Sequence, residues 1–279
     1  MTRLDRRALF ASGAAAALLA ATGLSAQAGP RAGGTLRVAV PREGDVLGLI
    51  ARRAVFETLT EIGPDGALRG ELASAWDSDA DARVWHFDLR EDVRFHDGSP
   101  LRAADVSASL ARLPRLASAQ ELSPRRLRLA MTQPVPDLPL LLAKDHFLIA
   151  PNGQFGATLA DAVGTGCYRV TSARDGRQFR AVRVADHHRT GRAGWAEAVE
   201  IIVIPDAAVR AEALCDGFVG ATVLPQADAI RARGEYRCHP SADDMQIAFS
   251  SQVGAPERIG PTTSLGDLRI AERWWLAET

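Results

Sequence analysis

Apolar residues alternate with polar ones in several short segments of the chain, as they do in strands with one buried face. The clearest of these segments are residues 35–40, 84–89, 127–131 and 245–249. Residues 199–204 are almost entirely apolar, which is typical of a strand buried on both faces. Residues 168–171 and 179–184 flank Asp175-Gly176, a dipeptide that favours a tight turn, and so predict a hairpin.

Other segments place apolar residues three or four positions apart, which is the spacing of one helix face. We expect helices over residues 51–62, 103–113, 227–233 and 268–276. Asp206 is expected to cap a further short helix, and Gly217 to end it. Strands and helices interleave without a repeat period, so the pattern predicts an α/β or α+β fold built around a mixed sheet.

The beginning of the chain has a different pattern, that of an export signal. Two arginines at positions 6 and 7 precede an apolar run, which ends at the small-residue triplet Ala26-Gln27-Ala28. A charged region, an apolar run and such a triplet form a secretory signal, and the paired arginines favour the twin-arginine type. The run is too short to anchor the chain in a bilayer. We therefore expect residues 1–28 to be a signal peptide and residues 29–279 to be periplasmic.

The composition is that of an ordinary globular protein, with 47% hydrophobic and 24% charged residues and a net charge of −1. This content of apolar residues excludes a disordered chain. The 33 basic residues are balanced by 34 acidic ones, so a broadly basic nucleic-acid-binding protein is excluded as well. Beyond the signal, no stretch reaches 18 uncharged apolar residues, and we expect no membrane span in the mature chain.

The chain has three cysteines, Cys167, Cys215 and Cys238. An odd number in an oxidising compartment allows at most one internal disulfide. If a bridge forms, Cys215 with Cys238 is favoured, because each of them borders a predicted element. The alternative is that all three are small buried apolar residues.

Residues 72–106 contain the most specific motifs of the chain. Trp85-His86-Phe87-Asp88-Leu89-Arg90 and, further on, Phe95-His96-Asp97-Gly98 closely resemble the signature of the bacterial extracellular solute-binding proteins of family 5. These proteins are the peptide, dipeptide and nickel receptors of ABC importers. Residues 164–170 resemble that family's G-T-G-P-Y motif, with Cys167 where the family usually has proline. The resemblance extends over about residues 33 to 250.

The resemblance implies a lobe of the class II periplasmic-binding-protein type. Members of the family are about twice as long as this chain and close two lobes around a ligand. Residues 267–279 resemble the start of the second lobe. We therefore expect residues 29–279 to form a single N-terminal lobe, with most of the second lobe missing.

The resemblance also implies a function, which is to bind a peptide or a related small solute for an ABC permease complex, without enzymatic activity or a cofactor. The loop after the first strand, with Arg42, Glu43 and Asp45, resembles the family's ligand-facing loop in position. Together with Cys167 these residues are our candidates for ligand binding. An ordinary solvated loop is the alternative reading of residues 42–45.

Two other functions stay open. A periplasmic accessory or assembly protein derived from such a receptor would bind a protein partner instead of a solute. Metal or haem binding is suggested by the histidines, with His187 and His188 as candidates. Adjacent histidines on a strand point to opposite faces, however, so we do not expect this pair to chelate one ion easily. Sequence motifs of the common enzyme classes are absent, and the resemblance gives His96 and Asp97 a structural role in a turn.

Overall fold

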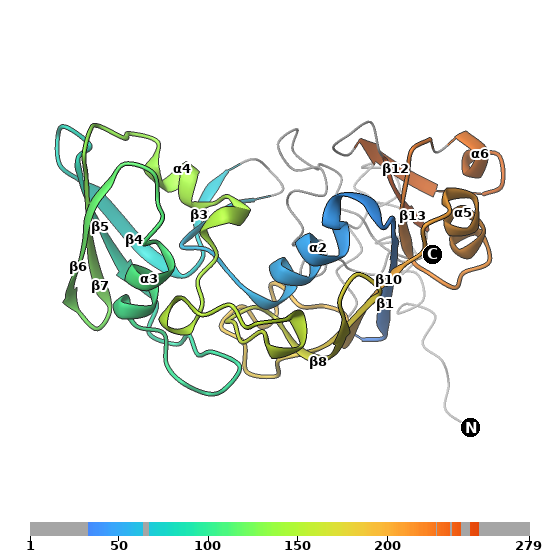
Figure 1. The fold of residues 1–279 in the computed structure, drawn as a ribbon, viewed down its shortest axis with the longest axis horizontal. Helices are drawn as coiled ribbons and strands as arrows, with labels where there is room; N and C mark the ends of the chain where they lie inside the picture. The colour runs from blue at the N-terminus through green and yellow to red at the C-terminus, as the bar shows by residue number, and fades with distance from the viewer. Residues whose placement is uncertain (1–32, 64–66, 227, 235, 241–245, 251–279) are drawn as a thin grey trace, which may run out of the picture.

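The computed structural model describes residues 33–63, 67–226, 228–234, 236–240 and 246–250. The predicted signal peptide, the helix expected over residues 268–276 and the segment that resembles the start of a second lobe lie outside the described residues. Within them the chain forms two sheets, each with its own apolar core, and helix α2 (Val46–Val55) lies between the sheets (Figure 1).

The larger sheet has seven strands in the order β12-β13-β11-β1-β10-β9-β8. Its strands are β1 (Thr35–Val40), β8 (Tyr168–Arg174), β9 (Gln178–Arg183), β10 (Ala198–Val203), β11 (Ala221–Leu224), β12 (Tyr236–Pro240) and β13 (Gln246–Ser250). Strand β1 pairs in parallel with β10 on one side and with β11 on the other, and the outer pairs are antiparallel. The structure confirms the predicted first strand, the predicted hairpin and the predicted buried strand, which is β10.

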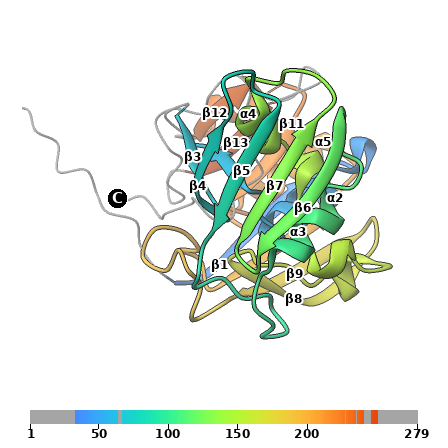
Figure 2. The same cartoon turned by 90° about the vertical axis from the view of Figure 1, so that its left-hand side faces the viewer.

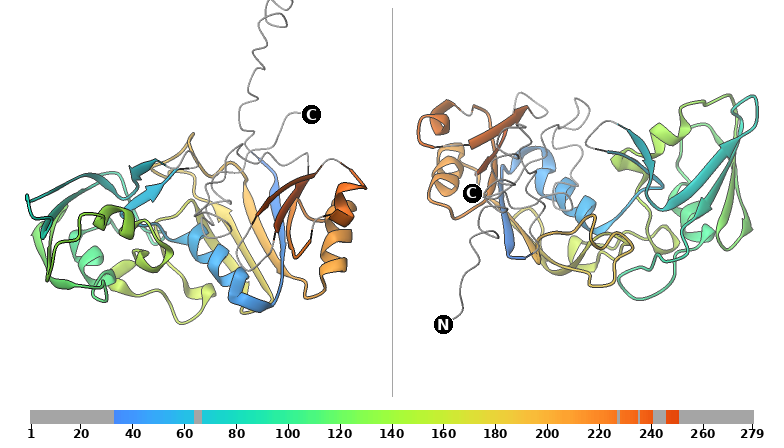
Figure 3. Two further views of the ribbon diagram at one scale, coloured as in Figure 1. Left: turned by 90° about the horizontal axis from the view of Figure 1, so that it is seen from above. Right: turned by 180° about the vertical axis from the view of Figure 1, so that it is seen from behind.

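Helices cover both faces of this sheet. In β1, Val38 packs into the core that contains Ile50 of α2, whereas its neighbour Ala39 packs with Leu214 of α5 (Ala207–Cys215). Successive residues of a strand point to opposite faces, so α2 and α5 lie on opposite sides of the sheet (Figure 3). Asp206 caps α5 as predicted, since its carboxylate accepts the backbone N–H groups of two residues in the first turn.

The smaller unit contains an antiparallel sheet in the order β4-β5-β7-β6, which Figure 2 shows face-on. Its elements are β4 (Ala73–Ser78), β5 (Val84–Leu89), β6 (Leu116–Ser123), β7 (Arg126–Met131), α3 (Ala103–Ser109), α4 (Leu138–Leu142) and the ribbon of β2 (Thr60–Ile62) with β3 (Leu68–Gly70). Buried Trp85, Phe87 and Leu89 alternate with partly exposed neighbours along β5, as the pattern predicted.

Short elements complete the chain. They are the 3-10 helices η1 (Glu43–Asp45), η2 (Asp145–Phe147), η3 (Pro151–Gly153) and η4 (Leu159–Asp161), and helix α6 (Asp228–Arg231). The architecture is therefore mixed α/β with a mixed sheet, which confirms the predicted fold class. No helix in the described part of the chain is long and apolar enough to cross a membrane.

One predicted helix is wrong at both ends. The helix expected over residues 51–62 begins at Val46 and ends at Val55, and Phe56 is already extended. The backbone N–H of Thr58 donates to the Glu71 carboxylate at 2.8 Å, while residue 57 forms a β-bridge with Ile149. These tertiary hydrogen bonds hold the segment extended, although its apolar spacing suits a helix.

The Phe95-His96-Asp97-Gly98 motif forms a hydrogen-bonded turn, as expected. Gly98 adopts a φ of 89°, which glycine reaches without steric cost, and the Asp97 carboxylate accepts the backbone N–H of Ser99. The imidazole Nε2 of His96 lies 2.8 Å from the carbonyl oxygen of Gly166 and donates to it. This contact fastens the motif of the smaller unit to the G-T-G segment of the larger one.

Candidate functional site

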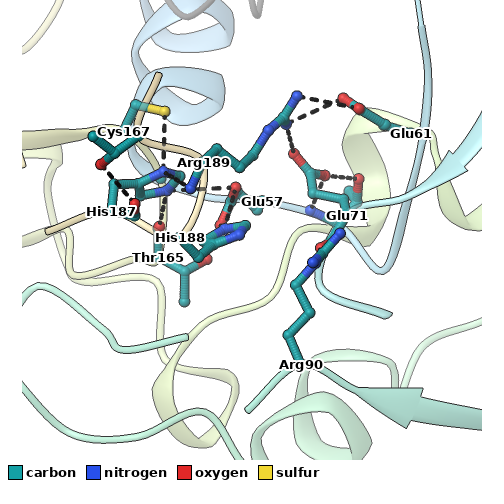
Figure 4. A network of polar contacts seen from close by, with 12 residues as sticks. Glu57, Glu61, Glu71, Arg90, Thr165, Cys167, His187, His188 and Arg189 are labelled. Atoms are coloured by element: carbon teal, nitrogen blue, oxygen red, sulfur yellow. Dashed lines mark hydrogen bonds and ion pairs between the residues drawn. The ribbon is translucent and has the colours of Figure 1, made fainter. Parts of the chain in front are cut away.

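A buried polar network, which we call the junction network, lies where the two apolar cores meet (Figure 4). It consists of Glu57, Glu61, Glu71, Arg90, Thr165, Cys167, His187, His188 and Arg189. Phe56 belongs to the core of the larger unit and Leu59 to that of the smaller unit, so Glu57 stands at the boundary between them. Residues 187–189 reach this boundary from the loop that follows β9.

One half of the junction network is an ion-paired cluster around Arg189. Its guanidinium donates to Glu61 at 3.1 and 3.2 Å and to Glu71 at 3.3 Å. The second oxygen of Glu71 accepts both the backbone N–H and the hydroxyl of Thr58 at 2.8 Å. The side chains of Glu61 and Glu71 are 6% and 0% exposed, so their charges depend on these partners rather than on water.

The other half joins Glu57 to two histidines. His188 Nε2 lies 2.9 and 3.0 Å from the two carboxylate oxygens of Glu57, and His187 Nε2 lies 3.6 Å from Oε1. The Glu57 side chain is 0% exposed. Burial by itself raises the pKa of the Glu57 carboxyl, but the electrostatic attraction of the His188 and His187 imidazoles and the hydrogen bonds they donate outweigh it and hold that pKa well below its usual value.

His187 has further contacts in the junction network. Its Nε2 lies 2.9 Å from the carbonyl oxygen of Thr165, and its Nδ1 lies 3.4 Å from Cys167 Sγ and accepts the backbone N–H of Arg189 at 3.1 Å. The sequence argument against joint chelation by His187 and His188 is wrong in its premise, because these residues lie in a turn and not on a strand. Their ring centroids are 4.3 Å apart, and both rings approach Glu57.

The predicted ligand-binding residues fall into two separate places. Cys167 is fully buried in the junction network, next to His187. Arg42, Glu43 and Asp45 are exposed at the other end of α2, a helix of ten residues that spans about 15 Å. The structure therefore does not bring Cys167 together with residues 42–45.

The exposed residues 42–45 form a surface that we call the strand-end rim. Strand β1 ends at Val40, and because β10 and β11 run parallel to it, the carboxyl ends of all three strands meet here. In open α/β sheets this edge is where ligands bind. Gly44 and Asp45 both have positive φ, at 75° and 48°, which turns the chain sharply from β1 into α2.

Arg210 of α5 braces the ends of two of these strands from inside. Its guanidinium donates to the carbonyl oxygens of Val223 at 2.8 Å and Ile204 at 2.6 Å, while the residue is only 2% exposed. Burial lowers the pKa of Arg210, and the carboxylates of Glu43 and Asp206 act in the opposite direction. The strand-end rim is thus an exposed loop, and hydrogen bonds from the buried Arg210 hold the strand ends next to it in place.

The structure holds all three cysteines as thiols. Cys215 and Cys238 pack against the same small apolar cluster without a bond between them, and their pairing in an oxidising compartment stays a prediction.

Sequence reasoning missed Glu57, Glu61 and Glu71 as members of a buried network. Glu57 and Glu61 interrupt a stretch that is otherwise apolar or β-branched, between Ala54 and Ile62. Charged residues within such a stretch are expected to be buried and paired. Their position in the sequence could therefore have indicated a buried polar network.

The two sheets, the parallel strands at the centre of the larger one and the exposed rim at their carboxyl ends define a lobe of a class II periplasmic-binding protein. The chain belongs to the bacterial extracellular solute-binding proteins of family 5, because the sequence model of that family's middle region matches residues 67–236.

Solved structures support the same fold. AgaA from A. tumefaciens R10, solved in complex with agropinic acid, is 22% identical with a TM-score of 0.67, over 75% of this chain and 48% of that one. NikA from Brucella suis, in complex with Fe(III)-EDTA, is 25% identical with a TM-score of 0.64, over 75% and 48%. AppA from Bacillus subtilis, in complex with a nonapeptide, is 17% identical with a TM-score of 0.64, over 76% and 49%.

Among curated relatives, the HTH-type transcriptional regulator SgrR of Pectobacterium atrosepticum is 32% identical over 165 residues, which are 55% of this chain and 29% of that protein. SgrR of Escherichia coli K12 is 34% identical over 127 residues, 42% of this chain and 23% of that protein. The chain therefore spans less than a third of these relatives and about half of the solved structures.

Proposed function

We propose that this protein is the substrate-binding component of an ABC importer, exported to the periplasm by its twin-arginine signal, and that it binds a peptide or a related small solute. Membership of family 5 supports a solute-binding role. Two proteins of the same fold, AgaA and AppA, were solved with agropinic acid and with a nonapeptide, which is in line with a polar solute as ligand.

The observation that carries the proposal is the strand-end rim, where three exposed charges of both signs stand at the carboxyl ends of three parallel strands. A zwitterionic peptide has a carboxylate for Arg42 and an ammonium group for Glu43 or Asp45, and such charge-assisted hydrogen bonds are the strong ones. The described residues supply one wall of a site, so we expect affinity below that of a ligand enclosed on all sides.

Removing the charges of the rim should weaken solute binding. We expect Arg42→Ala to lower the affinity for the best peptide about tenfold, which is what a loss of about 1.4 kcal/mol means. Isothermal titration with pools of short peptides, followed by single members of an active pool, measures the effect. Arg112→Ala removes an equally exposed arginine from the smaller unit and should leave the affinity unchanged. Equal affinities of R42A and R112A would contradict the assignment of the rim.

A second candidate function, an accessory protein that binds a protein partner, is favoured by one observation. Phe218, which follows α5, is 70% exposed. Aromatic side chains are enriched in the cores of protein interfaces. In addition, a sequence similar to part of this chain occurs in SgrR, a protein that is named a transcriptional regulator and not a solute receptor.

If the accessory function holds, the protein should capture a partner from periplasmic extract, and the variant Phe218→Ser should capture much less of it. Isothermal titration with the peptide pools should then show no heat of binding. Truncating an aromatic anchor at the centre of an interface costs about 2 kcal/mol or more, which is a loss of about thirtyfold in affinity. Leu122→Ser, which removes another exposed apolar side chain, is the matched control. Partner binding that is equal in F218S and L122S would contradict this candidate.

A further inference from the structure

The buried carboxylate of Glu57 requires a cation beside it. A carboxylate that is removed from water is stable only when its charge is compensated. The basic groups that contact Glu57 are His187 and His188, and Arg189 beside them is paired with Glu61 and Glu71. A neutral imidazole donates a hydrogen bond but supplies no positive charge. The charge must therefore come from a proton on a histidine or from a metal ion between the three side chains.

The geometry of the three side chains suits a metal ion. One ligand atom each from Glu57, His187 and His188 can be chosen so that all three lie within 4.8 Å of one another. The separations from Glu57 Oε1 to the two Nε2 atoms are 2.9 and 3.6 Å. Ligands about 2.0–2.2 Å from a tetrahedral zinc ion are separated by roughly 3.3–3.6 Å. Small side-chain shifts, together with loss of the proton and of the hydrogen bond from His187 Nε2 to the Thr165 carbonyl oxygen, would convert the present contacts into a coordination shell.

Some buried polar atoms in and around this cluster also lack a hydrogen-bond partner. Among the described residues, His188 Nδ1, His96 Nδ1 and Thr165 Oγ1 are buried polar atoms without a hydrogen-bond partner. Thr165 is the residue whose carbonyl oxygen contacts His187, and His96 contacts the neighbouring Gly166. Buried polar atoms are normally paired, if necessary by an ordered water. If His188 binds the ion through Nε2, its Nδ1 points away from the ion, and an ordered water outside the coordination shell would be its partner.

We propose that Glu57, His187 and His188 form a binding site for one divalent cation of borderline character, for which Zn²⁺ is the representative. Two imidazole nitrogens and a carboxylate oxygen are ligands that such ions prefer, and three protein ligands leave one position open. The site joins Glu57, two residues after the end of α2, to the loop after β9, so the ion cross-links segments 130 residues apart in the sequence. It lies at the far end of α2 from the strand-end rim and does not depend on solute binding.

The test measures zinc content and thermal stability of the mature protein, purified without a histidine tag. Because the site is buried, the protein is stripped with a chelator in denaturant and refolded with or without ZnCl₂, then desalted. We expect one equivalent of zinc in the desalted protein. In a separate thermal scan, with free Zn²⁺ kept at about a hundred times Kd, we expect a Tm higher by about 5–10 °C. Refolding with Co²⁺ should give the visible absorption of a tetrahedral nitrogen and oxygen site.

Glu57→Gln keeps the size of the side chain and removes its charge, and His188→Gln removes a ligand from the other segment. Both variants should lose the zinc, the rise in Tm and the cobalt absorption, while circular dichroism checks that they fold. His146→Ala removes an exposed histidine outside the cluster and should retain all three signals. The proposal is overturned if wild-type protein refolded with ZnCl₂ holds no more zinc than folded E57Q or H188Q.

Discussion

Arg189→Met should destabilise the protein by about 3–5 kcal/mol, because it leaves two carboxylates in the protein interior without their common cation. Methionine keeps most of the length of the side chain, so the lost charge dominates over lost packing. Glu61 and Glu71 cannot turn to solvent, since both side chains are almost fully buried. Urea unfolding followed by circular dichroism measures the change in the free energy of unfolding.

The matched control is Arg233→Met, which breaks the ion pair of Arg233 with Glu212 on the surface. Both of these side chains are about half exposed, and exposed pairs contribute about 0–1 kcal/mol. Arg189→Lys keeps the charge and should fall between the two, because ammonium cannot bridge both carboxylates with the guanidinium geometry. If R189M cost no more than R233M, the junction network would not stabilise the contact between the two units.

Gly166→Ala is the second change for which we expect a large loss of stability. The Gly166 backbone N–H donates to the carbonyl oxygen of Val55 at 2.8 Å, and an added Cβ would lie 2.5 Å from the carbonyl oxygen of Ala54. These atoms are backbone at the end of α2 and cannot rotate away. We expect a cost of about 3 kcal/mol, at the upper end of overpacking effects, measured as a shift of the urea midpoint.

Gly176→Ala separates this close approach from the ordinary cost of replacing glycine. Gly176 lies in the β8–β9 turn with a φ of 64°, and open space surrounds the position of an added Cβ. Only backbone strain of about 1–2 kcal/mol is expected there. A loss for G166A no greater than that for G176A would show that α2 can move away from the G-T-G segment.

The regular elements could be predicted from the sequence because their signal is local. Period-two patterns located β1, β5 and β7, an almost entirely apolar run located β10, and the Asp206 cap located α5. The helix over residues 51–62 was misplaced because its last part is held by Glu71 and Ile149, and these partners are remote in the sequence.

The candidate site was predictable only in part for the same reason. Arg42, Glu43 and Asp45 could be found because they directly follow a recognisable strand. Cys167 and His187 were each visible as separate features, but their contact and the approach of Glu57 join segments 20 and 130 residues apart. No spacing rule connects such positions, because turns and sheet order decide which loops meet.

The central position of β1 has a consequence for the timing of folding. Residues 35–40 are synthesised before all the other described strands, yet their parallel partners begin at Ala198 and Ala221. At about 5–20 residues per second, the strand waits roughly 10–30 s for its first neighbour. Its apolar residues have no parallel partner to pair with during that interval, so β1, the first of the described strands to be synthesised, stays unpaired for most of the synthesis. A chaperone that binds apolar segments is most needed there.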